Sequence, residues 1–237
     1  MSARLTDPPV NQSVERAARM LGLFSVDEPE LSLTQLTIRM GFNKATAHRY
    51  ATALRHAGLL RASGGLYTLG PRIVELAAAA LAGLGVIRVA DPYMRSLVTE
   101  TGQTAVLSVW DGEAPVVVRV AENHERLVRI VVAAGSRLPP DSAQGKVFRA
   151  FLDGADDPET AGVRSGRLAA NAVVVEGVTA VAAPVFQGEE IVATLALVGT
   201  SAGIDARPEG AMAEALRDAA EALSTELGFV QAREVPR

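Results

Sequence analysis

Two short helical segments separated by a glycine turn are the feature that most constrains how this sequence can fold. Residues 33–54 read LTQLTIRMGFNKATAHRYATAL. Ser32 and Gln35 have the spacing of a capping box, which predicts that the first helix begins immediately after Ser32. Gly41 tolerates the left-handed conformation that ends many helices, and Asn43 is a favourable N-cap for the second helix. The stretch therefore predicts a helix-turn-helix.

Each of the two helices has an apolar side that predicts its buried face. We expect the inward-facing residues to be Leu33, Leu36, Ile38 and Met40 in the first helix, and Ala47, Tyr50, Ala51 and Leu54 in the second. The opposite face of the second helix carries Lys44, Ala45, Thr46, His48, Arg49, Thr52 and Arg55. Short side chains at the helix start would allow close approach to the DNA major groove, and the cations and hydroxyls would bind phosphates and base edges. The alternative is an ordinary amphipathic helix pair with a solvated polar face.

A β-hairpin is predicted directly after these helices. Residues 59–63 and 66–69 flank Gly64-Gly65, a turn pair that tolerates positive φ. A helix-turn-helix followed by such a hairpin is a winged helix. The sequence therefore predicts a winged helix-turn-helix, in which the second helix of the pair is the recognition helix.

The candidate DNA-binding residues come from both helices and the wing. They are Ser32, Thr34, Lys44, Ala45, Thr46, His48, Arg49, Thr52, Arg55 and Tyr67. Arg49 is the main candidate for reading a base, because a guanidinium can donate two hydrogen bonds to guanine, a contact that contributes about 1–3 kcal/mol of discrimination. For His48 the alternative is a partly exposed residue without a contact. Tyr67 could donate to a phosphate, but packing against the domain is favoured.

Basic residues are concentrated in the N-terminal part of a chain that is acidic overall. Residues 1–73 contain nine Lys and Arg against five Asp and Glu, whereas the complete chain has a net charge of −4. A basic module on an acidic body is the arrangement expected of a DNA reader, because the duplex attracts the module and repels the body. The basic residues are few, so useful affinity would need the two modules of a dimer on two half-sites.

Length and composition limit the class of protein. The chain has 237 residues and 49% hydrophobic content, which is enough for two compact domains. The absence of Cys excludes disulfides, thiol nucleophiles and Cys-based metal sites. No apolar run approaches the length of a membrane span, and the first residues, MSARLTDPPVNQ, lack the apolar core of a signal peptide. We therefore expect a cytoplasmic protein that does not bind a membrane.

The segment after Gly70-Pro71 is predicted to be a helix with an apolar stripe and few charges. The stripe comprises Ile73, Leu76, Ala77, Ala80, Leu81 and Leu84. We expect one uninterrupted linker helix whose apolar surface is covered by a partner chain; the alternative is a core helix of a single domain. The predicted organisation is a winged helix-turn-helix DNA-binding domain at 1–70, the linker helix at 71–86 and a second domain at 87–237.

The second domain is predicted to contain an antiparallel sheet. Helices are expected to open at Asp91-Pro92 and near Asp141-Ser142, and to occupy 209–227. Strands are expected at 104–110, 116–121, 127–133, 178–186 and 191–198. Hairpin-connected strands with helices at both ends indicate an α+β domain with helices packed on one face of the sheet. Residues 153–171 show the least regular pattern.

The sequence contains few of the residues and motifs that are typical of enzyme active sites. Of its three histidines, His48 and His56 lie in the predicted DNA-binding module, which leaves His124 alone in the second domain. No G-x-S-x-G, G-x-x-x-x-G-K-[ST] or strand-linked G-x-G-x-x-G occurs, so nucleophile elbows and nucleotide phosphate loops are not indicated. Zinc would need more His or Cys than the second domain holds. We therefore expect no enzyme activity, no cofactor and no metal.

Across essentially its full length the sequence resembles transcription regulators of the IclR family. The matching motifs are SVERAARMLGLF, LSLTQLTIRMGFNKATAHRYATALRHAGLL, YTLGPRIVELA, GSRLPPDSAQGK and GVTAVAAPV. The resemblance implies a winged helix joined by a linker helix to a GAF-like effector-binding domain. It also implies dimers, or dimers of dimers, that bind a promoter palindrome in double-stranded DNA. In this family a small molecule, often an organic acid or aromatic catabolite, changes DNA affinity.

The expected effector site lies in the second domain. Residues 142–146 are predicted to begin a helix, whose exposed N–H groups and dipole favour an anion such as a carboxylate. Gly145 would allow a ligand or a strand to approach closely. The resemblance places this stretch at the mouth of the pocket, with a floor and return strands from the sheet. The candidate effector-binding residues are Val106, Ser108, Ser142, Ala143, Gly145, Thr179 and Leu195.

Three features near the expected pocket depart from the family pattern. The loop at Pro139-Pro140-Asp141 is shorter by a residue or two, the segment between Phe151 and Val173 is also shorter, and Thr179 stands where many relatives have Cys. The function expected is a homodimeric, effector-responsive repressor. The alternative is a winged-helix protein-interaction module with a degenerate, ligand-free second domain.

Overall fold

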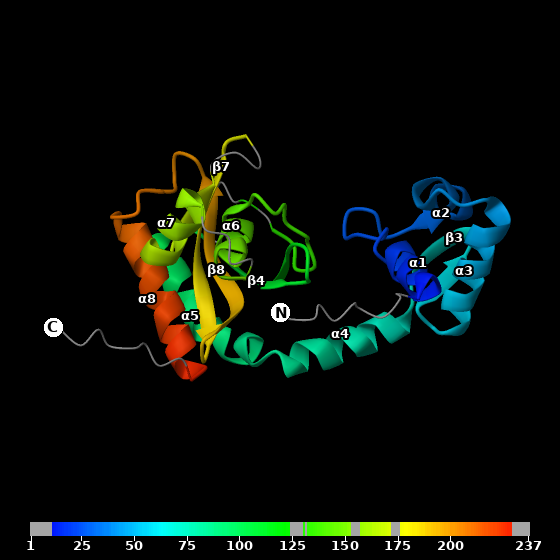
Figure 1. Ribbon diagram of the computed structural model, residues 1–237, viewed down its shortest axis with the longest axis horizontal. Helices are drawn as coiled ribbons and strands as arrows, with labels where there is room; N and C mark the ends of the chain where they lie inside the picture. Colours follow the sequence, from blue (N-terminus) through cyan, green and yellow to red (C-terminus); the bar gives the residue numbers. More distant parts are fainter. Residues whose placement is uncertain (1–10, 124–129, 131, 153–156, 172–175, 229–237) are drawn as a thin grey trace, which may run out of the picture. The chain divides into compact units, whose positions relative to one another are not determined.

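The computed structural model describes residues 11–123, 130, 132–152, 157–171 and 176–228 (Figure 1). The chain divides into two compact units, residues 1–81 and 82–237. Among the described residues, no single helix has both the length and the apolar character needed to cross a membrane. Within that part, one pair of helices, α4 (Pro71–Gly83) and α5 (Gly85–Thr101), passes the test of length and composition when taken together, although the pair is bent at the break between them.

The N-terminal unit is a three-helix domain with a small antiparallel sheet. Its elements are α1 (Gln12–Leu21), β1 (Leu31–Ser32), α2 (Leu33–Met40), α3 (Lys44–His56), β2 (Leu60–Ser63) and β3 (Leu66–Leu69). The strands are ordered β1-β3-β2. Gly64 and Gly65 both have positive φ, 58° and 84°, as the turn between β2 and β3 requires. The winged helix-turn-helix predicted from the sequence is confirmed.

The core of this unit comes from all three helices and the sheet. Its buried members include Met20, Leu31, Leu36, Met40, Ala51, Leu54 and Leu60. The expectation that Ile38 faces inward is wrong, because its side chain is 73% exposed. Helical geometry explains this, since Ile38 lies about 160° around α2 from both Leu36 and Met40.

Helix α4 (Pro71–Gly83) begins with a proline at its first position and has no buried residue. Val74, Leu76 and Leu81 are exposed apolar side chains on it. The expected uninterrupted linker is broken at Leu84, and α5 (Gly85–Thr101) follows. Helix α5 also begins before Asp91-Pro92, so the prediction that this pair opens a helix is wrong and Pro92 lies inside it.

The C-terminal unit is built on a five-stranded antiparallel sheet with the order β5-β4-β8-β7-β6. Its elements after α5 are β4 (Thr104–Trp110), β5 (Pro115–Ala121), α6 (Ala143–Leu152), α7 (Pro158–Gly166), β6 (Ala169–Asn171), β7 (Val178–Gln187), β8 (Glu190–Thr200) and α8 (Ala211–Glu226). The predicted α+β class and the antiparallel sheet are confirmed.

Helices cover both faces of this sheet, so the expectation of helices on one face is wrong. Helices α5 and α8 pack on one face, while α6 and α7 pack on the other (Figure 1). The strands explain the difference. Strands β7 and β8 read VTAVAAPVFQ and EIVATLALVGT, nearly continuous apolar runs of the kind found where both faces of a sheet are buried.

Two further segments differ from expectation. The strand predicted at 127–133 falls largely outside the described residues, and Ile130, Val132 and Ala133 are not in a strand. Residues 157–171, which showed little pattern, contain α7 and β6. Helix α7 is capped by Asp157, whose carboxylate accepts from the backbone N–H groups of Glu159 and Thr160, and Pro158 follows the cap. Residues 153–156 lie outside the described part.

Candidate nucleic-acid interface and effector site

The outward face of α3 combines exposed cations with short polar side chains. Lys44, Ala45, His48, Arg49 and Arg55 are exposed, and Thr46 and Thr52 are half-buried. The opposite face is fixed in the core by Ala47, Ala51 and Leu54. Within the described part of the chain, Lys44, Arg49 and Arg55 form no ion pair. Their charges are therefore available to an external anion.

Two features fix the start and orientation of α3. The Asn43 side chain accepts from the backbone N–H of Thr46 at 2.8 Å, which caps the helix, and Gly41 takes the left-handed conformation with φ 66°. The rings of Phe42 and Tyr50 stack with centroids 5.5 Å apart, and the guanidinium of Arg16 lies 5.8 Å from the Phe42 centroid. These contacts join α1 to the recognition helix.

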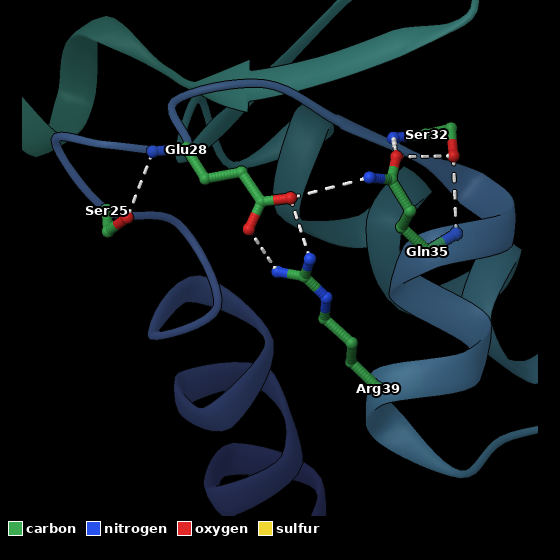
Figure 2. Close-up of polar contacts among 5 residues, drawn as sticks. All are labelled: Ser25, Glu28, Ser32, Gln35 and Arg39. Atoms are coloured by element: carbon green, nitrogen blue, oxygen red, sulfur yellow. Dashed lines mark hydrogen bonds and ion pairs between the residues drawn. The ribbon is translucent and has the colours of Figure 1, made fainter.

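A polar network joins α2 to the loop that precedes it (Figure 2). Ser32 and Gln35 form the predicted capping box, with the Gln35 side chain accepting from the Ser32 N–H at 2.9 Å. The Gln35 amide donates to Glu28 at 3.4 Å, and Arg39 donates to both Glu28 oxygens. The hydrogen bond from Arg39 lowers the pKa of the Glu28 carboxyl below its ordinary value. Ser25 accepts from the Glu28 N–H at 3.0 Å.

Three DNA-binding candidates outside α3 have different environments. The Ser32 hydroxyl is already engaged with Gln35, whereas Thr34 is exposed on the first turn of α2. Tyr67 is only 9% exposed and packs in the core of the unit, the role that the sequence favoured for it. Arg61 on β2 is a further exposed cation of this unit that is not among the sequence candidates.

The effector-site candidates on α6 and β4 lie in one layer of the C-terminal unit. Val106 and Ser108 project from β4 towards the side that α6 covers, and Ala143 packs there from α6. The Ser142 hydroxyl accepts from the Gly145 N–H at 3.1 Å and so caps α6. A Cβ on Gly145 would lie 2.2 Å from the Pro140 carbonyl oxygen. The close approach that requires glycine is therefore made by the preceding loop.

The placement of Thr179 and Leu195 in this site is wrong. Leu195 belongs to the core formed with α5 and α8, on the other face of the sheet. Thr179 lies on that same face by strand alternation, and its hydroxyl donates to Ser201 at 2.9 Å. The neighbours Ala180 and Ala196 face α6 instead. A shift of one residue along a strand reverses its face, which explains both errors.

Two polar residues of the α6 layer were missed by sequence reasoning. Thr194 on β8 is fully buried, and its hydroxyl has no hydrogen-bond partner, like that of Ser108. Gln144 on α6 is 2% exposed, and no hydrogen bond of its side-chain amide occurs within the described part of the structure. The available signals were a threonine within the apolar run of β8 and a glutamine on the buried side of a helix.

No three His, Asp or Glu side chains among the described residues are grouped so as to hold a metal ion. The two regions offer cations and neutral hydrogen-bonding groups instead. Such groups suit the binding of a nucleic acid backbone in the first unit and of a small molecule in the second.

Each of the two units matches the sequence model of a known protein domain. The sequence model of the IclR helix-turn-helix domain matches residues 13–64, and that of the bacterial transcriptional regulator IclR C-terminal domain matches residues 78–164. Together the two matches cover more than half of the chain.

Individual relatives cover different shares of the chain. The HTH-type transcriptional regulator XynR of Escherichia coli is 30% identical over 251 residues, which is 93% of this chain and 99% of that protein. The transcriptional repressor IclR of E. coli is 29% identical over 147 residues, 60% of this chain and 53% of that protein. An IclR homolog from Microbacterium hydrocarbonoxydans, solved in complex with 4-hydroxybenzoate, shares the fold with a TM-score of 0.71 at 23% identity, covering 91% of this chain and 99% of that one. The chain belongs to the IclR family of DNA-binding transcriptional regulators.

Proposed function

We propose that the chain acts as a homodimeric repressor whose operator affinity is set by a small-molecule effector. In this proposal residues 1–70 bind a promoter palindrome, residues 71–86 connect the domains, and residues 87–237 bind the effector. The protein acts in the cytoplasm and has no catalytic role. The observation that carries the proposal is the set of free cations on the outward face of α3.

The cations on the outward face of α3 differ in their contacts from other cations of the same domain, and this difference supports DNA binding. Arg39 is paired with Glu28, and Arg19 donates to the Met40 carbonyl oxygen at 3.1 Å. Both are thereby used within the domain. Lys44, Arg49 and Arg55 make no such contact with any residue that the structure describes, although each is on the helix that a winged helix inserts into the major groove. Together with Thr46, His48 and Thr52, they form the proposed operator-reading surface.

Dimerisation is supported by the apolar surface of α4. Val74 is 70% exposed, Leu76 49% and Leu81 41%. These side chains lie on a helix with no buried residue, so a second copy would remove them from water. A dimer would also double the number of free recognition-helix cations on a palindromic operator.

The effector role rests on the layer between α6 and the sheet. The structural relative from Microbacterium hydrocarbonoxydans was solved with 4-hydroxybenzoate, a small aromatic acid. We propose that this chain binds its own effector near Val106, Ser108, Ser142 and Ala143. The effector must bind two arrangements of the winged helices with different affinity. Effector binding must also change operator affinity through a connection that is interrupted at Leu84, between α4 and α5. A ligand that binds tightly yet leaves operator affinity unchanged contradicts this coupling.

The test is recovery of sheared genomic DNA by the purified protein, followed by sequencing. We expect a few enriched fragments that share a palindrome, and loss of their enrichment with Arg49→Ala. Arg88→Ala is the matched control, because Arg88 is an exposed cation on α5 outside the winged helix. Enrichment that survives Arg49→Ala, or no enriched sequence with and without candidate effectors, would favour a winged helix that docks on a protein.

A further inference from the structure

Three polar groups without hydrogen-bond partners lie in the layer between α6 and the sheet. Two are the hydroxyls of Ser108 and Thr194, whose residues have no solvent exposure. The third is the side-chain amide of Gln144, a residue that is 2% exposed. Buried polar groups in folded proteins are nearly always hydrogen-bonded, so the two buried hydroxyls need an explanation.

The three residues come from elements that pack on each other. Ser108 and Thr194 are directly opposite in the pairing of β4 with β8. Both lie on the α6 side, because Val106 and Ala196, two residues along each strand, belong to that layer. Gln144 lies one turn before Phe148 on α6, and the Phe148 ring contacts Trp110 at the end of β4 with centroids 5.3 Å apart. The polar groups are thus surrounded by an otherwise apolar layer.

The charged residues of α6 pair with a carboxylate of α7, and the Nε atom of Arg149 is buried without a hydrogen-bond partner. Lys146 pairs with Glu159 of α7 at 2.8 Å, and Arg149 approaches the same carboxylate at 3.5 Å. No Lys or Arg is among the buried residues in the described part of the chain. A buried carboxylate would therefore lack a counter-charge, and the helix N-terminus offsets only a small part of the cost of desolvating an anion.

We propose that Gln144, Ser108 and Thr194 bind the uncharged polar end of the effector, such as a primary amide or a carbonyl with a hydroxyl, and select against a carboxylate. This inference rests on the proposed effector role of the same domain. An amide and two hydroxyls can each donate and accept hydrogen bonds. They therefore complement a neutral ligand group that also donates and accepts hydrogen bonds. Gln144 is the specificity-determining residue, because its amide is larger and reaches further from the backbone than either hydroxyl.

The first experiment measures thermal unfolding of the full-length protein without ligand. Gln144→Leu should raise Tm by a few degrees, because an apolar side chain of similar size replaces an unsatisfied amide. Gln103→Leu is the matched control. Gln103 is also buried, at 4% exposure, but its amide donates to the Gly203 carbonyl at 2.9 Å, so its loss should lower Tm. A Tm for Gln144→Leu that is unchanged or lower would overturn the proposal.

The second experiment uses matched pairs of small compounds in saturation-transfer NMR at millimolar concentration. The pairs are benzamide and benzoate, 4-hydroxybenzamide and 4-hydroxybenzoate, and nicotinamide and nicotinate. We expect at least one amide to bind more strongly than its acid, and its signal to fall severalfold with Gln144→Leu but not with Gln103→Leu. Stronger binding of the acids, amide binding that survives Gln144→Leu, or binding of neither member of any pair contradicts the inference.

The DNA-recovery experiment on wild-type protein separates this inference from the proposed function. A protein that recovers its operator but prefers the acids retains its regulatory role and loses only the assignment of a neutral effector. A protein that binds the amides through Gln144 but recovers no DNA supports the ligand site and refutes the proposed operator binding.

Discussion

Arg39 binds Glu28 through two hydrogen bonds of 2.6 and 2.7 Å, one from each terminal nitrogen of its guanidinium. The pair joins α2 to the loop that follows α1, and the Gln35 amide approaches the same carboxylate at 3.4 Å (Figure 2). This arrangement holds the end of α2 in place and neutralises a cation of the helix-turn-helix. Arg39 is consequently unlike Arg49, which forms no ion pair with the described residues.

The Glu28–Arg39 pair predicts a pH dependence of stability. Because Arg39 lowers the pKa of Glu28 below 4.5, the folded protein holds this carboxylate ionised more strongly than the unfolded chain does. The stabilisation is complete above pH 4.5 and is lost as pH falls through the lowered pKa. Glu28→Gln should therefore reduce Tm at neutral pH, and the difference from wild type should shrink under acidic conditions. Thermal unfolding across pH checks this, and a constant difference would contradict it.

Arg49→Ala should weaken operator binding by about tenfold or more, because a bidentate contact to guanine contributes about 1–3 kcal/mol. Arg49→Lys should recover only part of the loss, since an ammonium group lacks the planar fork of the guanidinium. Electrophoretic mobility shifts on the recovered operator, compared with scrambled DNA, measure both effects. If Arg49→Ala weakened binding to the operator and to the scrambled DNA by the same factor, Arg49 would contact a phosphate and not a base.

Gly145→Ala should destabilise the C-terminal unit by about 1–3 kcal/mol, the usual range for overpacking. The added Cβ would lie 2.2 Å from the Pro140 carbonyl oxygen, and backbone would have to move. Gly162→Ala is the control, because nothing lies within 4 Å of that Cβ in α7 and alanine should stabilise the helix by about 0.5–1 kcal/mol. Chemical denaturation measures the free energy of unfolding of both variants. Equal changes in the two would show that the loop at Pro140 moves to accommodate the added Cβ.

In the proposed homodimer, Val74→Glu combined with Leu76→Glu should shift the protein from dimer to monomer. Both side chains are exposed on α4, and two charges in an apolar interface would be buried without partners. Ile38→Glu is matched for exposure, at 73% against 70% for Val74, and should leave the oligomeric state unchanged. Sedimentation velocity at several concentrations reports the result. A dimer that persists in the double variant would place the interface elsewhere.

Much of the N-terminal unit was predictable because its signals are local. The capping box of Ser32 and Gln35, the left-handed Gly41 and the Asn43 cap each act within four residues. The Gly64-Gly65 turn likewise specifies its own hairpin. The prediction for Ile38 failed because apolar character alone does not identify the buried side of a short helix.

The effector-site candidates were predicted less well, because they depend on which face of a strand meets which helix. Val106 lies in one layer with Ala143, and Ser108 shares that face by strand alternation, whereas Leu195 and Thr179 lie on the other face of the sheet. Gln144 and Thr194 were not recognised, since a polar residue becomes informative only when its burial and lack of a partner are known.

The sequence by itself determined the helix caps of the N-terminal unit, the hairpin turn, the antiparallel class of the sheet and the family. Tertiary structure decided which cations are free, which strand faces meet α6, and which buried polar groups lack partners. The physical reason is the range of the interactions. Caps and turns are closed by residues three or four positions apart, whereas Arg39 finds Glu28 eleven residues away and Ser108 meets Thr194 only through the pairing of β4 with β8.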